Sequence, residues 1–264
     1  MTEPSDLPMF VINLDRSPER LARFLADNAM PGLAITRIAA VDGRTLDRDA
    51  LIRAGLVAAD LQHTNNVLGC SLSHVACWQL IAQGDRPTVV CEDDAVLRRD
   101  FVTLHRHLEP AIREADIVFW ACNLDMHVAF EIPGMGLATL MFDQSLLDSE
   151  TRIKAFQEQR SATVLYPLRR VWGTAAYTIT PKGARRLLDL ALPLRPGAGD
   201  VSYPTGDGRL WHMHFTSWGI DMVIGLVHVD EIKGMIAVPP VALGRNPKAD
   251  SSIGEERLIA AAAG

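Results

Sequence analysis

Two kinds of apolar segment alternate along the chain. Short continuous runs are typical of buried strands, and longer stretches carry apolar side chains at helical spacing. The strand-like runs are Met9 to Leu14, Ile35 to Val41, Thr88 to Cys91, Ile117 to Trp120, Thr174 to Ile179 and Ile236 to Val241. The helical stretches are 17–25, 47–55, 71–84, 101–112 and 180–191. Strands that alternate with helices predict an α/β fold with a mostly parallel sheet flanked by helices.

The residues that border these stretches are of the types that begin and end helices. Ser17 suits the N-cap position of the first helix, and Pro18 suits its first helical position. Ser71 or Ser73 is expected to cap the third helix, which Gly84 would end.

Two segments, 123–170 and 193–219, show no clear period and are expected to form long loops or an inserted lobe. A helix near 150–159 is the one regular element predicted within them. The pattern as a whole predicts a single domain over residues 1–245, followed by a tail, 246–264.

Composition limits the classes of function. With 264 residues, of which 48% are hydrophobic and 22% charged, the chain is ordinary for a globular protein. A net charge of -6 argues against a nucleic-acid partner. No stretch reaches the roughly 20 apolar residues of a spanning helix, and the first residues lack the pattern of a secretion signal. We therefore expect a cytoplasmic protein, with peripheral attachment to the inner face of a membrane left open.

The four cysteines form no CxxC pair. They are Cys70, Cys77, Cys91 and Cys122. Small buried hydrophobes in a reducing compartment are favoured over a disulfide framework or a zinc site.

An acidic triplet, Glu92, Asp93 and Asp94, follows the strand-like run 88–91. On an extended chain, Glu92 and Asp94 point to one side and Asp93 to the other. At the end of a strand in an open α/β sheet, such side chains reach the crevice where ligands bind. Two carboxylates there suit magnesium or manganese, which in turn bridges a diphosphate. A solvated acidic turn is the alternative.

Asn13, Asp15 and Arg16 lie where the first strand ends and the first helix begins. The N–H groups and the dipole of a helix N-terminus favour anions. Asn13 or Asp15 could bind a nucleotide base or ribose, and Arg16 could meet phosphate. A capped helix with solvated charges explains the same residues.

Three further motifs carry weaker signals. Ser73 and His74 precede the strand that carries the triplet, although a histidine in such a place is more often a satisfied core residue. The run WGTAAY, 172–177, combines small residues with aromatic rings that could stack on a sugar, or it forms a tightly packed strand. Asp221 begins an element, which suits either a general base or an ordinary N-cap.

Taken together, these motifs resemble glycosyltransferase family 25, which includes bacterial lipopolysaccharide galactosyltransferases and collagen galactosyltransferases. The matching stretches, in the order of that family, are VINLDRSPERLARF, IAAVDGR, GCSLSHVACWQLI, TVVCEDDAVL and WGTAAYTITPKGARRLL. They cover roughly residues 9 to 190, and GIDMVIGLV and SSI are weaker matches beyond.

The resemblance implies a Rossmann-like GT-A fold that binds a UDP-sugar, often UDP-galactose, uses manganese or magnesium, and inverts the anomeric carbon. It puts Glu92-Asp93-Asp94 in the place of the family's acidic motif. Our hypothesis for the mechanism is that Asp94 and Glu92 bind the metal and that Asp221 is the general base. The remaining candidate binding residues are Asn13, Asp15, Arg16, Ser73, His74 and Asp93. The acceptor, a glycan or a lipopolysaccharide-type glycolipid, would meet segments 123–170 and 193–219. A metal-dependent phosphohydrolase or nucleotidyltransferase, and a non-catalytic nucleotide-sugar-binding relative, stay open as alternatives.

Overall fold

The computed structural model describes residues 6–204, 210–215 and 218–245. The strands are β1 (Leu7–Asn13), β2 (Leu33–Ala39), β3 (Thr88–Glu92), β4 (Ala95–Leu97), β5 (Ile117–Phe119), β6 (Val128–Ile132), β7 (Gly136–Leu140), β8 (Val164–Arg170), β9 (Ala176–Ile179), β10 (Gly199–Pro204), β11 (Leu210–Phe215), β12 (Gly234–Val238) and β13 (Ala242–Gly244). The α-helices are α1 (Pro18–Asp27), α2 (Arg48–Arg53), α3 (Asn65–Ala82), α4 (Phe101–His107), α5 (Glu109–Glu114), α6 (Glu150–Gln157), α7 (Pro181–Ala191) and α8 (Ile220–Met222). Short 3₁₀ turns, η1 (Gly43–Thr45) and η2 (Gln144–Asp148), and a π-helical turn, η3 (Val223–Val227), complete the set.

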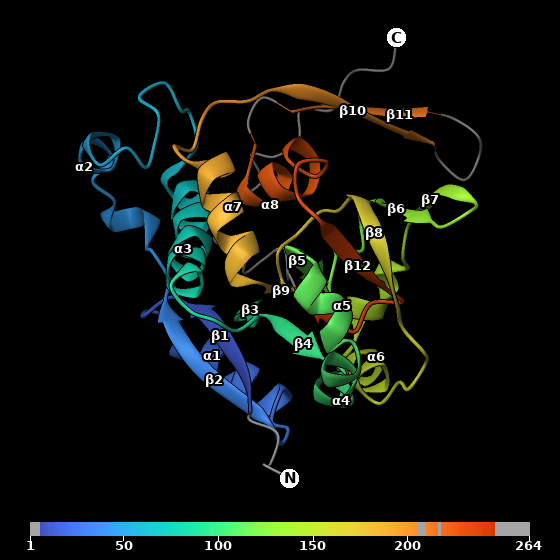
Figure 1. The fold of residues 1–264 in the computed structure, drawn as a ribbon. Coiled ribbons are helices and arrows are strands. Elements are labelled where there is room, and N and C mark those ends of the chain that lie inside the picture. The colour runs from blue at the N-terminus through green and yellow to red at the C-terminus, as the bar shows by residue number, and fades with distance from the viewer. Residues whose placement is uncertain (1–5, 205–209, 216–217, 246–264) are drawn as a thin grey trace.

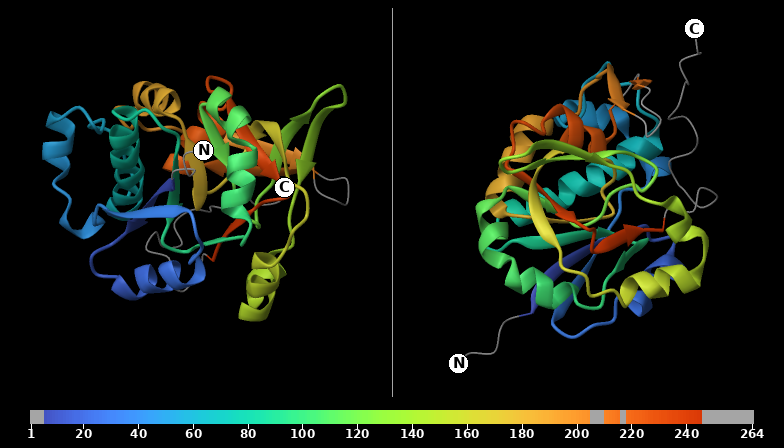
Figure 2. Two further views of the ribbon diagram at one scale, coloured as in Figure 1. Left: turned by 60° about the horizontal axis from the view of Figure 1, so that its bottom comes forward. Right: turned by 90° about the vertical axis from the view of Figure 1, so that its right-hand side faces the viewer.

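A nine-stranded sheet in the order β2-β1-β3-β9-β5-β12-β8-β6-β7 forms the centre of the fold (Figure 1). Strands β2, β1, β3, β5, β12 and β6 share one direction, and β9, β8 and β7 run the opposite way. Helices pack on both faces, and the β6–β7 hairpin extends from one end of the sheet (Figure 2). The predicted α/β class, a largely parallel sheet flanked by helices, is confirmed.

Apolar side chains on the two faces of the sheet form two separate cores. Helices α3 and α7 pack side by side and cover one face, where Trp78 and Leu187 are completely buried. Helices α1, α4 and α5 cover the other face through Phe24, Phe101 and Ile112. Within the described part of the chain, no helix combines the length and the apolar character needed to cross a membrane.

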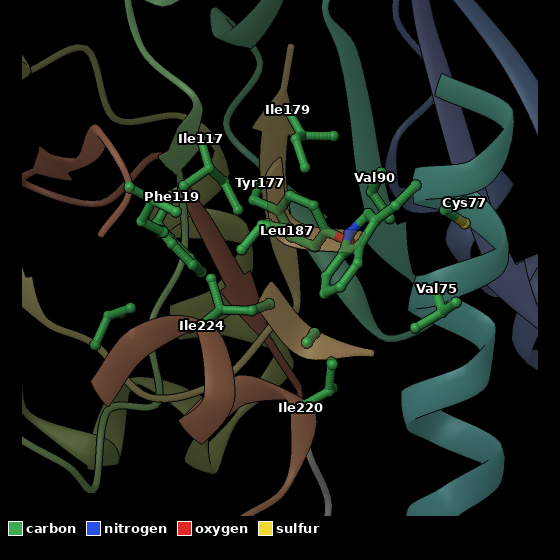
Figure 3. Packing of buried hydrophobic residues seen from close by; sticks show 14 of the residues in the cluster. Val75, Cys77, Val90, Ile117, Phe119, Tyr177, Ile179, Leu187, Ile220 and Ile224 are labelled. Atoms are coloured by element: carbon green, nitrogen blue, oxygen red, sulfur yellow. The ribbon is translucent and has the colours of Figure 1, made fainter. Parts of the chain in front are cut away.

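Strand β9 lies antiparallel between β3 and β5, so residues far apart in the sequence become neighbours. Tyr177 of β9 is paired with Val90 on one side and Phe119 on the other (Figure 3). Its side chain is fully buried. The segment that leads into β9 is therefore brought to the end of β3.

Strand β1 is the point at which the chain changes direction across the sheet. From β1 the chain passes through α1 to β2 on one side, and it later returns to β3 on the other side. In open α/β sheets such a switch point leaves a crevice at the carboxyl ends of the two diverging strands.

The predicted N-cap of helix α3, Ser71 or Ser73, is wrong. It begins at Asn65 with Thr64 as its N-cap, so Ser71 and Ser73 lie in its interior. Both serine hydroxyls donate to the carbonyl four residues earlier, Ser73 to that of Gly69 at 2.7 Å. The first turn of α3 is polar, so the apolar pattern begins later than the helix itself. The N-cap, and not the apolar pattern, marks where this helix starts.

The stretch 101–112 is two helices rather than one, because Pro110 has no N–H to donate to the carbonyl of Arg106 and its ring crowds that carbonyl, so the first helix cannot continue through it. Segment 123–170 is not a loop region but supplies β6, β7 and β8 to the sheet, together with the predicted helix, α6. Segment 193–219 contains the β10–β11 hairpin. Strand pairing is a long-range effect, so it leaves a weak local pattern. The predicted tail, 246–264, lies outside the described residues.

A buried histidine, His105, packs into the core that α1, α4 and α5 cover. His105 is 4% exposed, and its Nε2 lies 3.1 Å from Thr178 Oγ1, which also accepts a hydrogen bond from the Trp120 indole. The ring packs against Phe101 and Trp120. Burial lowers the pKa of His105 from 6.5 to about 4.

This histidine should make the protein sensitive to mild acid. The unfolded chain takes up the proton near pH 6.5 and the folded chain only near 4, so stability falls as pH falls through that window. The expected slope is at most about 1.4 kcal/mol per pH unit. Urea unfolding of the wild type and His105→Gln between these pH values measures it. Parallel stability curves for the two proteins would contradict the prediction.

Candidate functional site

A pocket of about 400 Å³ lies at the carboxyl ends of β1 and β3, at the switch point of the sheet. One wall comes from β1 and the first turns of α1, and the opposite wall comes from α3 and the end of β3. The lining residues are Ile12, Leu14, Arg16, Ser17, Glu19, Arg20, Arg23, Ala40, Val41, Gly43, Asn66, Cys70, Ser73, His74, Glu92 and Asp93. Cationic side chains of α1 thus face the acidic end of β3.

Asp93 is the most enclosed carboxylate of the triplet. It is 9% exposed, and both of its oxygens are engaged. Asn13 Nδ2 donates to Oδ2 at 2.7 Å, and Arg20 Nε donates to Oδ1 at 2.8 Å, with a second donation from the same guanidinium. Burial alone lowers the pKa of Arg20, but the bond to Asp93 and the charges of Asp94 and Glu92 raise it overall. Asp93 therefore ties the triplet to β1 and α1.

Asn13 is held in one orientation by its partners. Its Oδ1 accepts from Arg37 Nε at 3.1 Å, and its Nδ2 also donates to the Ser17 carbonyl at 2.9 Å. Arg37 also pairs with Asp15, whose side chain is 82% exposed. Asn13 and Asp15 are not among the lining residues, so they support the pocket from behind.

Arg16 lies at the rim of the pocket, where its guanidinium meets Asp42 at 3.2 Å. Asp42 also accepts from Arg44, and these hydrogen bonds hold the pKa of Asp42 well below its usual range. Ser73 accepts from the Val41 N–H at 2.9 Å and so fixes the same rim to α3. Of the residues predicted for the nucleotide end, Arg16 is the one in direct contact with the pocket.

Glu92 is the last residue of β3, and it meets two other elements. Its Oε1 accepts from Thr174 Oγ1 at 2.6 Å, and it lies 3.6 Å from His74 Nε2. His74 is 1% exposed. Thr174 was not among the predicted residues, and the small-residue run around it is the one sequence signal that could have indicated a contact there.

Asp93 and Asp94 lie in a turn, so strand alternation applies to Glu92 but not to the two residues after it. Asp94 faces β13: its carbonyl accepts from the Arg245 N–H, and its Oδ1 lies 4.0 Å from where a Cβ on Gly244 would be. Asp94 is not one of the lining residues of the pocket.

Asp221 is the second residue of α8, which Gly219 caps, so it is not the N-cap. It is 5% exposed, and its Oδ2 accepts from the Gly173 N–H at 3.3 Å. Gly173 and Thr174 are adjacent, so one dipeptide contacts both Asp221 and Glu92. Three segments that the sequence singled out separately meet at this point.

The aromatic residues of the WGTAAY run are packed and do not offer a face to a sugar. Tyr177 is fully buried, and Trp172 is 3% exposed against Phe215. Tight packing was the correct alternative for these two rings, although only Ala176 and Tyr177 of the run lie in a strand, β9. The cysteines also match expectation, because no disulfide joins them and three are buried. Burial raises the pKa of Cys77 to about 12.

The carboxylates fit a hard divalent cation only when a substrate completes its shell. Among the described residues, no group of three or more His, Cys, Asp or Glu side chains could hold a metal by itself. Glu92 and Asp94 supply carboxylate oxygens within one turn. Magnesium is commonly bound by one or two carboxylates together with substrate phosphates and water, so the donor set suits a metal that arrives with a diphosphate.

A polar crevice at the switch point of an open α/β sheet, with carboxylates at the end of an inner strand, is typical of nucleotide-binding α/β proteins. Residues 6–202 match the family model described as glycosyltransferase family 25 (LPS biosynthesis protein). This protein belongs to glycosyltransferase family 25.

Curated relatives share this part of the chain. The "Inactive glycosyltransferase 25 family member 3" of Mus musculus is 28% identical over 197 residues, which are 68% of this chain and 28% of the mouse protein. The "Probable inactive glycosyltransferase 25 family member 3" of Rattus norvegicus is also 28% identical, over 68% of this chain and 29% of its own length. A "Glycosyltransferase 25 family member" of Aedes aegypti is 35% identical over 95 residues, 33% of this chain and 16% of the mosquito protein. The chain therefore spans less than a third of the length of these relatives.

The geometry around Asp93 predicts that Asn13→Asp destabilises the fold. The change removes two donated hydrogen bonds and sets a second carboxylate 2.7 Å from Asp93. We expect a loss of roughly 2–4 kcal/mol in the free energy of unfolding. Chemical denaturation measures it.

Asn65→Asp is the matched control, because Asn65 is exposed in the first turn of α3, where an acidic residue is tolerated. If both variants unfold at the same denaturant concentration, Asn13 does not hold Asp93 in the way described.

Proposed function

We propose that this protein transfers a sugar, galactose in the leading case, from a UDP-sugar to a glycan or lipopolysaccharide-type acceptor with inversion at the anomeric carbon. The observation that carries the proposal is the pocket at the switch point, which sets arginines of α1 opposite the acidic end of β3. Family membership supplies the class of reaction, and the pocket supplies the place for the donor.

The α1 side of the pocket suits the diphosphate of such a donor. Arg16, Arg20 and Arg23 line it, together with the N-terminal turn of the helix. Guanidinium groups match phosphate oxygens in a two-pronged geometry, and free N–H groups at a helix start favour anions. Arg20 is held by the buried Asp93, whereas Arg16 pairs with the more exposed Asp42, so we expect Arg23 and Arg16, rather than Arg20, to turn toward phosphate.

The β3 side suits a divalent cation that accompanies the donor. Glu92 and Asp94 would hold manganese or magnesium, which when bound neutralises charge on the departing diphosphate. Asp93 takes no part in this binding, because Asn13 and Arg20 occupy both of its oxygens. Its task is to hold the turn that carries Asp94 beside the pocket.

Asp221 is the proposed general base. Its Oδ2 accepts from the Gly173 N–H, and the next residue, Thr174, donates to Glu92. An acceptor hydroxyl placed over this dipeptide would be within reach of the Asp221 carboxylate, which would take its proton as the bond to the sugar forms.

A second candidate function is nucleotide-sugar binding without transfer. The names of the mouse and rat relatives describe them as inactive, and both align over 68% of this chain. The pocket serves binding in either case. The two functions differ in what Asp221 and the metal do after the donor has bound.

The first test is a thermal-shift panel of nucleoside diphosphates, with and without manganese. We expect UDP to raise the melting temperature only when manganese is present, because the carboxylates alone repel the diphosphate. Asp94→Asn should remove this shift and leave the melting temperature of the ligand-free protein unchanged.

Asp85→Asn is the control. Asp85 is exposed and precedes the N-terminal end of β3, away from the triplet, and its substitution removes the same charge. A UDP shift of equal size without metal would sink the metal assignment. Release of inorganic phosphate from the nucleotide would favour a phosphohydrolase instead.

The second test concerns Asp221. Asp221→Asn should lower the rate of transfer or of slow UDP-sugar hydrolysis by roughly 10²–10⁴-fold, the usual contribution of a positioned base. The affinity for UDP with manganese should not change. Loss of UDP binding would place Asp221 in the donor site, and wild-type protein that binds UDP-galactose but neither transfers nor hydrolyses it would favour the non-catalytic function.

A further inference from the structure

Three buried side chains, of which His74 lines the pocket, form a series of polar contacts that ends at Glu92. The Tyr177 hydroxyl lies 2.9 Å from the indole Nε1 of Trp78 and 2.9 Å from Nδ1 of His74. His74 Nε2 lies 3.6 Å from Oε1 of Glu92. All three rings are at most 1% exposed, so water does not compete for these contacts.

The number of hydrogens on each group fixes which atom donates and which accepts in this series of contacts. The Trp78 indole can only donate, so the Tyr177 oxygen accepts from it. The hydroxyl has a single hydrogen, and His74 Nδ1 is the other polar atom in contact with it. Burial raises the pKa of Tyr177 well above its ordinary value, which keeps that hydrogen in place.

His74 Nδ1 is therefore the acceptor, and the proton of the neutral ring belongs on Nε2. The opposite tautomer would set two N–H groups against one hydroxyl oxygen and leave the tyrosine hydrogen buried without an acceptor. A buried polar group left in that state costs about 1–3 kcal/mol.

The Nε2–H of His74 then faces the Glu92 carboxylate. The 3.6 Å separation is longer than a hydrogen bond, and Nε2 makes no hydrogen bond in the described part of the chain. Thr174 donates to the same Oε1 from the other side at 2.6 Å. The side chain of Glu92 is thus set between a hydroxyl donor and an imidazole donor, from two different elements.

We infer that Trp78, Tyr177 and His74 form a positioning relay, which fixes His74 as the Nε2–H tautomer and so orients the Glu92 carboxylate for ligand binding. The tautomer follows from the buried contacts alone. The consequence for a metal-bound nucleotide rests on the proposed function. Such outer partners of a binding carboxylate are typically worth about 10–100-fold in affinity or activity.

The tautomer can be measured without any activity. In protein with ¹⁵N-labelled histidine, the resonances that disappear in His74→Gln belong to His74. We expect a protonated Nε2 and an unprotonated Nδ1, and a change in the Nε2 signal in Glu92→Gln. Tyr177→Phe should shift the tautomer balance, whereas Tyr166→Phe, on β8, should not. A protonated Nδ1 in the wild type, or no response to both Tyr177→Phe and Glu92→Gln, would overturn the relay.

The positioning role is tested by two substitutions of one residue. In His74→Gln the amide nitrogen can take the place of Nε2 and present an N–H toward Glu92. In His74→Asn the shorter amide can meet Tyr177 but cannot reach Glu92. We expect the dissociation constant of UDP with manganese to rise about 10–100-fold in His74→Asn and to stay near the wild-type value in His74→Gln.

Equal affinities in the two variants, at comparable melting temperatures, would overturn the positioning role. If the wild type itself binds no UDP with manganese, the proposed function fails. The relay is then judged by the response of the His74 Nε2 signal to Glu92→Gln, which needs no nucleotide.

Discussion

Three carboxylates in succession at the end of a buried strand repel one another, and this repulsion has to be offset by partners from the surrounding elements. For Asp93 the repulsion is offset by hydrogen bonds from Arg20 of α1 and Asn13 of β1. Glu92 turns to Thr174 and His74 on the far side of β3. The triplet is thereby the junction at which β1, α1, α3 and the segment before β9 are joined, and the pocket exists because these four come together there.

The antiparallel strand β9 extends this junction toward the second half of the chain. Because it is inserted between β3 and β5, the residues just before it pass the end of β3. One dipeptide then contacts both Glu92 and Asp221. Gly225, in the π-helical turn after Asp221, leaves space for this approach: a Cβ there would lie 2.1 Å from the Val171 carbonyl oxygen. Turns of this kind occur often at functional sites.

The proposed function divides its two tasks between separate groups of residues. It assigns donor binding to the arginines beside β1 and to the end of β3, and proton transfer to Asp221, which another element carries. A relative could keep the first set and lose the second without losing the fold. The names of the mouse and rat relatives are consistent with such a separation.

Local sequence determined the elements whose signals are short-range. Each strand-like run overlaps a strand of the structure, although 236–241 continues past the end of β12 and 174–179 begins before β9. The Ser17-Pro18 helix start and the α/β class were predicted correctly, because such signals act within a few residues. The motifs for the site were also found locally, and the triplet does lie at a strand end beside the pocket.

Tertiary structure alone decided how those motifs are used. Asp93 is paired with Arg20, and Asn13 and Asp15 do not line the pocket. Tyr177, one of the rings expected to stack on a sugar, is buried. Tertiary structure also turned the weakly patterned segment 123–170 into strands of the main sheet. Each of these outcomes depends on a partner tens of residues away, and the pairing energy of such contacts leaves no mark on the periodicity of either segment.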